Sequence, residues 1–453
     1  MTARPPTDPL PMRLLLALAA VLLALPAQAQ EPKAQRGPFA IVDAAVETVA
    51  NGRLDRATVL VGADGRIAGV GPDLPVPDGA ARIDGAGLTV YPGLIDAGTR
   101  LGLSEVGSLD ETRDYREIGD VTPHMEALTA VNPSSALIPI NRAQGVTTVL
   151  AVPAGGMMPG TAALVHLFGY TPEQMAAGFR GVVLNWPSTA RRGSWDRRER
   201  EAIDKTAKEA MEKLDEVWDD AALYARIDSA HAADPDANGA PAYAPELAAL
   251  AEAVTGRLPL LIEADAARDI EAALKWLEDK PAVRPVLTSV AEGWRVADQI
   301  AAAGVPVLTG PVLAEPTRES DRYDKPYQNA GLMHQAGVQV ALRTSEVENV
   351  RNLAFNAGFA AAYGAPFGFG REEALRAVTL APAEIFGIAA ETGSVEAGKR
   401  ADLVVADGDL FEPKTQVRHV LVGGWLMPME DRQSRLYDEY LDRQPGLVNP
   451  SGR

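Results

Sequence analysis

The chain of 453 residues contains no cysteine, only five histidines and no Gly-X-Ser-X-Gly motif. The absence of cysteine excludes disulfide bonds, thiolate metal ligands, cysteine nucleophiles and a lipid-modified N-terminal cysteine. The missing motif excludes the nucleophile elbow of α/β-hydrolases. Lysine and arginine number 43 against 61 acidic residues, which gives a net charge of −18. That balance argues against nucleic acid and anionic membrane surfaces as partners, because no basic stripe neutralises phosphates.

The N-terminal segment has the three parts of an export signal. Arg13 precedes an apolar run, Leu14–Leu25, that is too short to span a bilayer as a stable helix. Ala27-Gln28-Ala29 then fits the small-X-small pattern of a signal peptidase site. The sequence predicts a signal peptide over residues 1–29, cleaved at its end, and a periplasmic protein without stable membrane insertion. A membrane anchor is the alternative, and the true start is Met1 or Met12.

Two regions of short strands flank a long central region. Residues 30–90 and 391–430 contain β-rich runs separated by turn residues, and residues 431–453 form a tail. In residues 91–390, apolar β-type runs alternate with helical patterns, as in an α/β protein with parallel strands. The candidate strands are Val146–Ala151, Val182–Asn185, Pro259–Glu263, Pro285–Ser289, Val305–Thr309 and Val338–Arg343, and candidate helices are Ala266–Leu277 and Glu346–Tyr363.

A charge-dense helical stretch interrupts the central region at residues 191–240. Its composition predicts a solvated helical insertion after a strand, because charges cover most of its surface. A lid or a partner-binding arm is the alternative interpretation.

The run Tyr91-Pro-Gly-Leu-Ile-Asp96 resembles the start of the first barrel strand in the amidohydrolase superfamily. Thr392–Asp407 resembles the C-terminal segment of that superfamily, and Pro259–Ile270 resembles the fifth strand of its imidazolonepropionase-like, exported branch. The resemblance spans residues 39–427. It implies a TIM-like (β/α)8 barrel beside a composite β-sandwich formed by the N- and C-terminal segments. It also implies hydrolysis of carbon–nitrogen bonds other than peptide bonds.

The resemblance further implies a zinc site, but the ligand positions of that site are altered. After Asp96 the superfamily has two histidines, where this chain has Gly98 and Arg100. Glycine offers no ligand atom, and a guanidinium is permanently cationic. Glu263 and Asp265 likewise stand at histidine positions of the fifth strand.

The later strands depart from the pattern in the same way. Ala291–Asp298 resembles the segment after the sixth strand but contains Glu292 and no histidine. Val340–Ser345 resembles the last barrel strand, with Arg343 in place of glycine and Ser345 in place of the aspartate ligand. These residues predict that no zinc and no other cofactor is bound, and they leave the catalytic residues unassigned.

Other ways of filling the site remain. All the histidines are predicted to be surface or hydrogen-bonded residues, namely His124, His166, His231, His334 and His419. Oxygen ligands suit magnesium or calcium, so one alternative is an all-carboxylate site of Asp96, Glu263, Asp265 and Glu292. Two nearby arginines oppose it. We expect instead that side-chain ion pairs refill the former metal site, formed by Arg100, Glu263, Asp265 and Arg343.

Two functional hypotheses follow. One is a family-type hydrolase with a rebuilt centre. The other, which the residues favour, is a non-catalytic pseudoenzyme that binds a small-molecule ligand or serves as partner subunit of an active paralogue. We expect an oligomer, formed either by identical chains or with that paralogue.

The glycine-rich segment Pro153–Gly160 lacks the lysine of a phosphate-binding loop and is predicted to line the barrel mouth, with a plain surface turn as the alternative.

Overall fold

The computed structural model describes residues 33–191 and 196–443. The chain divides into two units, Met1–Lys33 and Ala34–Arg453, and the fold below belongs to the second. The predicted signal peptide, residues 1–29, lies outside the described residues, as do residues 444–453 of the tail. Within the described ranges, no helix is both long and apolar enough to cross a membrane.

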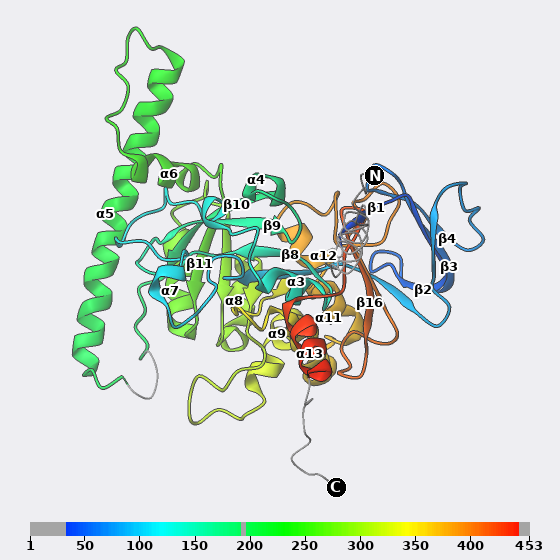
Figure 1. The fold of residues 1–453 in the computed structure, drawn as a ribbon. Coiled ribbons are helices and arrows are strands. Elements are labelled where there is room, and N and C mark those ends of the chain that lie inside the picture. Colours follow the sequence, from blue (N-terminus) through cyan, green and yellow to red (C-terminus); the bar gives the residue numbers. More distant parts are fainter. Residues whose placement is uncertain (1–32, 192–195, 444–453) are drawn as a thin grey trace, which may run out of the picture. The chain divides into compact units, whose positions relative to one another are not determined.

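The central region forms an eight-stranded, nearly closed sheet, which confirms the predicted barrel (Figure 1). Its strands follow the chain in order, and β14 lies beside β7, where the Ser345 N–H donates to the Gly98 carbonyl at 2.9 Å. The strands are β7 (Leu94–Thr99), β8 (Val146–Ala151), β9 (Gly160–His166), β10 (Ala176–Asn185), β11 (Leu260–Ala264), β12 (Pro285–Ser289), β13 (Val307–Thr309) and β14 (Val340–Leu342).

One barrel strand departs from the parallel pattern. β9 pairs antiparallel with both β8 and β10, whereas β7–β8 and all pairs from β10 to β14 are parallel. The segment between β8 and β9 is too short for a crossover helix, which a parallel pair would need. Gly155 in this segment and Gly160 at the start of β9 have φ of 135° and 152°, which favour glycine.

Helices follow the later strands, as in βα repeats. α7 (Ala267–Leu277), α8 (Ala297–Ala303), α9 (Lys325–Gln335) and α10 (Leu353–Gly364) come after β11 to β14 in turn. The remaining helices are α2 (Ala127–Ala130), α3 (Leu137–Arg142), α4 (Pro172–Met175), α5 (Arg200–Ala233), α6 (Pro245–Val254), α11 (Arg371–Ala377), α12 (Leu380–Ile385) and α13 (Arg432–Asp442).

Apolar side chains plug the barrel interior. The buried cluster includes Ile95, Leu150, Leu164, Leu261 and Leu308, from five different strands. Because successive side chains on a strand alternate between its two faces, residues two apart share a face. Glu263 and Arg343 therefore lie on the same inward face as the core residues that precede them, at the end of the barrel where the parallel strands terminate.

The N- and C-terminal segments meet in a second sheet of nine strands, as predicted for the composite sandwich. Central to it is the antiparallel pair β6–β15, which joins residues 89–92 to residues 403–406. The strands are β1 (Gln35–Arg36), β2 (Phe39–Glu47), β3 (Arg53–Val61), β4 (Ile67–Gly71), β5 (Ala81–Asp84), β6 (Thr89–Pro92), β15 (Leu403–Ala406), β16 (Val417–Val422) and β17 (Trp425–Leu426).

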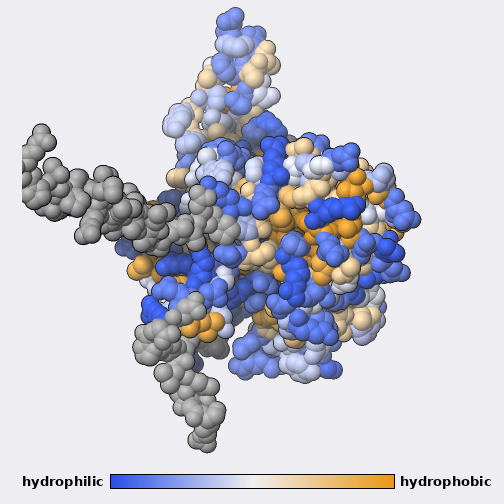
Figure 2. Space-filling view, turned by 45° about the vertical axis from the view of Figure 1, so that its right-hand side comes forward, coloured by the Kyte–Doolittle hydropathy of each residue, from blue (hydrophilic) through white to orange (hydrophobic). Residues whose placement is uncertain are grey.

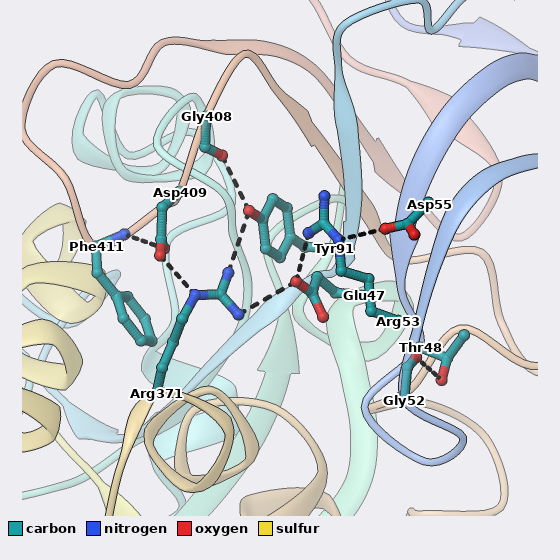
Figure 3. A network of polar contacts seen from close by, with 10 residues as sticks. All are labelled: Glu47, Thr48, Gly52, Arg53, Asp55, Tyr91, Arg371, Gly408, Asp409 and Phe411. Atoms are coloured by element: carbon teal, nitrogen blue, oxygen red, sulfur yellow. Dashed lines mark hydrogen bonds and ion pairs between the residues drawn. The ribbon is translucent and has the colours of Figure 1, made fainter. Parts of the chain in front are cut away.

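A polar network joins this sheet to the barrel helices (Figure 3). The Arg371 guanidinium of α11 lies 2.5 Å from an Asp409 carboxylate oxygen and 3.2 Å from Glu47 of β2. It also donates to the hydroxyl of Tyr91 at 3.4 Å, and that hydroxyl donates to the Gly408 carbonyl at 2.9 Å. Burial raises the pKa of Tyr91, so the hydroxyl remains a neutral donor.

The charged insertion is a helix of 34 residues, α5, followed by a return to α6. Its part up to Ala221 buries Ile203, Leu214 and Trp218, while the rest of the helix and the following loop extend away from the barrel as an arm (Figure 1). The arm is mostly hydrophilic and stands at the top of the space-filling view (Figure 2). Leu223, Ile227 and Tyr243 are its exposed large apolar residues.

Candidate functional site

The sequence-predicted site residues come from four places around the barrel mouth. Asp96 and Gly98 belong to β7, with Arg100 just beyond it. Glu263 is the penultimate residue of β11, and Asp265 directly follows the strand. Glu292 follows β12, and Arg343 and Ser345 follow β14. In parallel sheets, the strand ends on one side collect into one region, which is why residues so distant in sequence approach each other.

Arg343 lies directly against Gly98. A Cβ built on Gly98 would be 2.7 Å from Nε of Arg343, 3.0 Å from Cζ and 3.2 Å from Cδ. Arg343 is only 6% exposed. The guanidinium therefore occupies the space above position 98, into which any larger side chain at that position would project.

The predicted ion-pair cluster forms only in part. Nη1 of Arg343 lies 3.6 Å from a carboxylate oxygen of Glu263, which is an ion pair at long range. The Nε of Arg343 is buried and has no hydrogen-bond partner among the described residues. The charge of Arg343 is therefore balanced at longer range, by the Glu263, Asp265 and Asp96 carboxylates, while its side chain packs against Gly98.

Arg100 does not join that cluster, and this part of the prediction is wrong. Its guanidinium carbon lies 4.8 Å from the centroid of the Tyr115 ring, a cation–π contact. No carboxylate in the described part of the chain comes within ion-pair distance of it. The sequence offered no sign of this contact, because Tyr115 lies in a long irregular loop without periodic pattern.

Asp96 is fully buried and is held by the backbone around it. It accepts hydrogen bonds from the Gly98 N–H at 2.9 Å, the Thr344 N–H at 3.2 Å and the Thr344 hydroxyl at 2.5 Å. Burial raises its pKa to about 6, although these hydrogen bonds and the charge of Arg343 act in the opposite direction. Its oxygens therefore fasten β7 to the segment after β14 and are not directed at a ligand.

Asp265 faces the open mouth. It accepts a hydrogen bond from the Ala291 N–H at 3.2 Å, and the Ser289 hydroxyl is a second partner. Water reaches the side chain, but protein surrounds it on most sides, and this burial raises its pKa. Ser289 and Val290 have φ of 71° and 54°, and this left-handed conformation is most strained at Val290, the β-branched residue of the two.

Glu292 fixes a loop. It is 2% exposed and receives the guanidinium Nη2 of Arg318 at 2.6 Å, the Thr317 hydroxyl at 2.9 Å and the Ala267 N–H at 3.0 Å. Burial alone would raise its pKa, but these hydrogen bonds outweigh it and the pKa lies below its usual value. The carboxylate thus ties residues 317–318 to the N-terminus of α7.

Two adjoining cavities open at the mouth, and both are lined by Ser188 and Asp265. The larger, about 1310 Å³, is lined by the loop that Glu292 holds and by Trp294 and Asn329 among others. The smaller, about 330 Å³, is lined by Arg100, Glu263 and Asp265, and by Pro153–Gly155. Of the glycine-rich segment Pro153–Gly160, the first three residues therefore line the barrel mouth, as predicted for the whole segment.

The residues present do not fit the zinc site that the resemblance implies. Position 98 has no ligand atom, and a cationic side chain fills the space above it. The alternative metal site of four carboxylates also fails, because the oxygens of Asp96 and Glu292 already accept hydrogen bonds from protein groups. Across residues 33–191 and 196–443, no group of three or more His, Asp or Glu side chains could hold a metal ion.

Three of the five histidines make specific contacts, whereas Nδ1 of His124 is buried without a hydrogen-bond partner among the described residues, so the prediction of a surface or hydrogen-bonded histidine is wrong there. His166 is buried and lies 3.0 Å from the Thr148 hydroxyl, and burial lowers its pKa to about 4. His231 lies 2.8 Å from the Asn238 carbonyl in the arm. His334 packs edge-on against Phe369.

Comparison with known proteins identifies the family. Residues 89–427 match the model of the Amidohydrolase family. A search of the curated proteins found no match. Among solved structures, an amidohydrolase from Thermotoga maritima MSB8 is 24% identical with a TM-score of 0.70, covering 85% of this chain and 98% of that one. A molinate hydrolase is 16% identical with a TM-score of 0.51, covering 88% and 96%. At these identities the likeness establishes the fold alone.

Proposed function

This chain belongs to the amidohydrolase family, and we propose that it is a metal-independent member that binds a small molecule at the barrel mouth without hydrolysing it. The observation that carries the proposal is the position of Arg343, whose guanidinium fills the space above Gly98. Metal-assisted hydrolysis needs a metal that activates water and polarises the scissile group. A permanent cation in that position repels a metal ion and supplies no ligand.

The cavities support the binding half of the proposal. Together they form a concave region with an apolar part, including Trp186, and a few charged groups, which is typical of small-molecule sites. Asp265 borders both cavities, so a ligand in either one meets its carboxylate.

The test is a search for hydrolysis. Purified protein is incubated with a panel of dipeptides and N-acyl amino acids, with and without added zinc or manganese, and products are followed by mass spectrometry. We expect no product that depends on metal. Turnover that a chelator abolishes and zinc restores would contradict the proposal.

We also propose that the protein is exported to the periplasm, on the pattern Ala27-Gln28-Ala29 behind a short apolar run. N-terminal mass analysis of the protein from a periplasmic extract tests this, and we expect a chain that begins near Gln30. An intact N-terminus found in the membrane fraction would contradict it.

A further inference from the structure

The smaller cavity has charges of opposite sign on different walls. Its lining comes from the segment after β7, the loop after β8, the segment after β10 and the end of β11. At about 330 Å³ it lies at the lower end of the range for ligand pockets. That size suits a molecule of a few heavy atoms up to a free amino acid.

Arg100 forms the cationic wall. The Tyr115 ring covers one face of its guanidinium at 4.8 Å, so the contact fixes the plane of the group without using its N–H donors. As no protein carboxylate in the described ranges pairs with it, those donors remain available to a ligand. The planar fork of a guanidinium matches the two oxygens of a carboxylate.

Glu263 and Asp265 form the anionic wall. They lie two residues apart at the end of β11, on the same face of the strand. Glu263 has only the 3.6 Å contact with Arg343, and Asp265 keeps acceptor capacity beyond its bond from Ala291. A third carboxylate in the lining, Asp269, is excluded because Ser188 and Thr189 already occupy it, at 2.6 Å each.

We propose that this cavity binds a small zwitterion, with its carboxylate on Arg100 and its ammonium group on Glu263 and Asp265. The inference rests on the proposed function and names the ligand class of that same site. A zwitterion can pair with both walls at once, because Arg100 offers N–H donors and Glu263 and Asp265 offer acceptor oxygens. A simple anion would meet both carboxylates, and a simple amine would leave Arg100 without a partner.

The first experiment is a thermal-shift screen of the purified protein against the common L-amino acids at about 10 mM, a concentration that reveals millimolar affinity. For the amino acid with the largest shift, calorimetry then compares it with its decarboxylated amine and its deaminated acid. We expect the amino acid to bind at least about tenfold more tightly than either single-charge analogue. No shift from any amino acid, or equal binding of the three, would overturn the proposal.

Two variants test which wall of the cavity binds the carboxylate and which binds the ammonium group. Arg100→Met should weaken amino-acid binding by about tenfold or more and leave the weak binding of the amine unchanged. Glu263→Gln should weaken both. Arg226→Met, on the exposed arm, is the matched control and should change neither. Unchanged amino-acid binding by Arg100→Met would contradict the assignment.

The outcome separates this inference from the proposed function. Zwitterion binding together with metal-dependent turnover would leave the ligand class standing and refute the metal-free function. Absence of both would refute the ligand class alone.

Discussion

The guanidinium of Arg343 packs against Gly98 so closely that a methyl group at position 98 would lie 2.7 Å from Nε. The absence of a side chain at Gly98 and the position of the Arg343 guanidinium depend on each other. Without a side chain at position 98 there is room for a guanidinium, and a side chain added there would force the guanidinium to shift. The space above position 98, where the resemblance implies a metal ligand, holds the guanidinium of Arg343.

We predict that Gly98→Ala destabilises the protein by about 1–3 kcal/mol, because the added methyl group overpacks a buried contact. Gly98 has no positive φ, so backbone strain does not contribute. The same change in an Arg343→Ala background should cost much less, with a coupling of more than about 0.5 kcal/mol. Urea denaturation of the wild type, the two single variants and the double variant measures this coupling free energy. Additive losses of stability would contradict the contact.

Arg343 should act mainly as a filler of space. Arg343→Ala leaves a cavity and should cost about 2–4 kcal/mol, whereas Arg343→Met retains most of the volume and should cost about 1 kcal/mol or less. Arg100→Ala, which removes a partly exposed stacking contact, should cost under about 1 kcal/mol. If Arg343→Met were as damaging as Arg343→Ala, the charge and not the packing would be decisive.

Asp96 should give the stability a distinct pH dependence. Its pKa in the folded protein is about 6, above the usual 3.8, so the folded state takes up the proton more readily than the unfolded state. As pH rises from about 4 to 6, the wild type should lose up to about 3 kcal/mol relative to Asp96→Asn and then level off. Denaturation curves at several pH values test this; a constant difference between the two proteins would refute it.

Glu292 should hold the loop of residues 311–324. Glu292→Gln removes the negative charge that accepts hydrogen bonds from Arg318, Thr317 and the Ala267 N–H. It should lower the free energy of unfolding by about 1–3 kcal/mol. Hydrogen exchange in residues 312–322 should become faster. Glu315→Gln, an exposed change in the same loop, is the control and should cost under about 0.5 kcal/mol. Equal exchange in both variants would rule out the anchoring role.

Much of the fold could be predicted from local patterns. The C-terminal motif and the alternation of apolar runs indicated the barrel and the composite sheet, because each run carries its own hydrophobic period. The antiparallel strand β9 was missed, since it follows a glycine-rich turn and no helix separates it from β8. A glycine-rich run predicts only a loop and does not indicate that an antiparallel strand follows it.

The site could be predicted as a set of positions but not as a set of contacts. Strand ends placed Glu263 and Arg343 together, and they do form an ion pair. The partner of Arg100 could not be predicted, because Tyr115 comes from an irregular loop. Glu292 takes its partners from a loop about 25 residues away, whose course depends on packing over the barrel mouth.

The central claim of the proposal is that protein atoms, not a metal, occupy the positions at which the family resemblance implies metal ligands. Metal analysis by mass spectrometry, on protein purified from zinc-supplemented culture without chelator, tests it most directly. With Gly98, Arg100 and Ser345 in place of ligands, we predict well under about 0.1 zinc per chain. About one zinc per chain, retained through dialysis, would contradict the account.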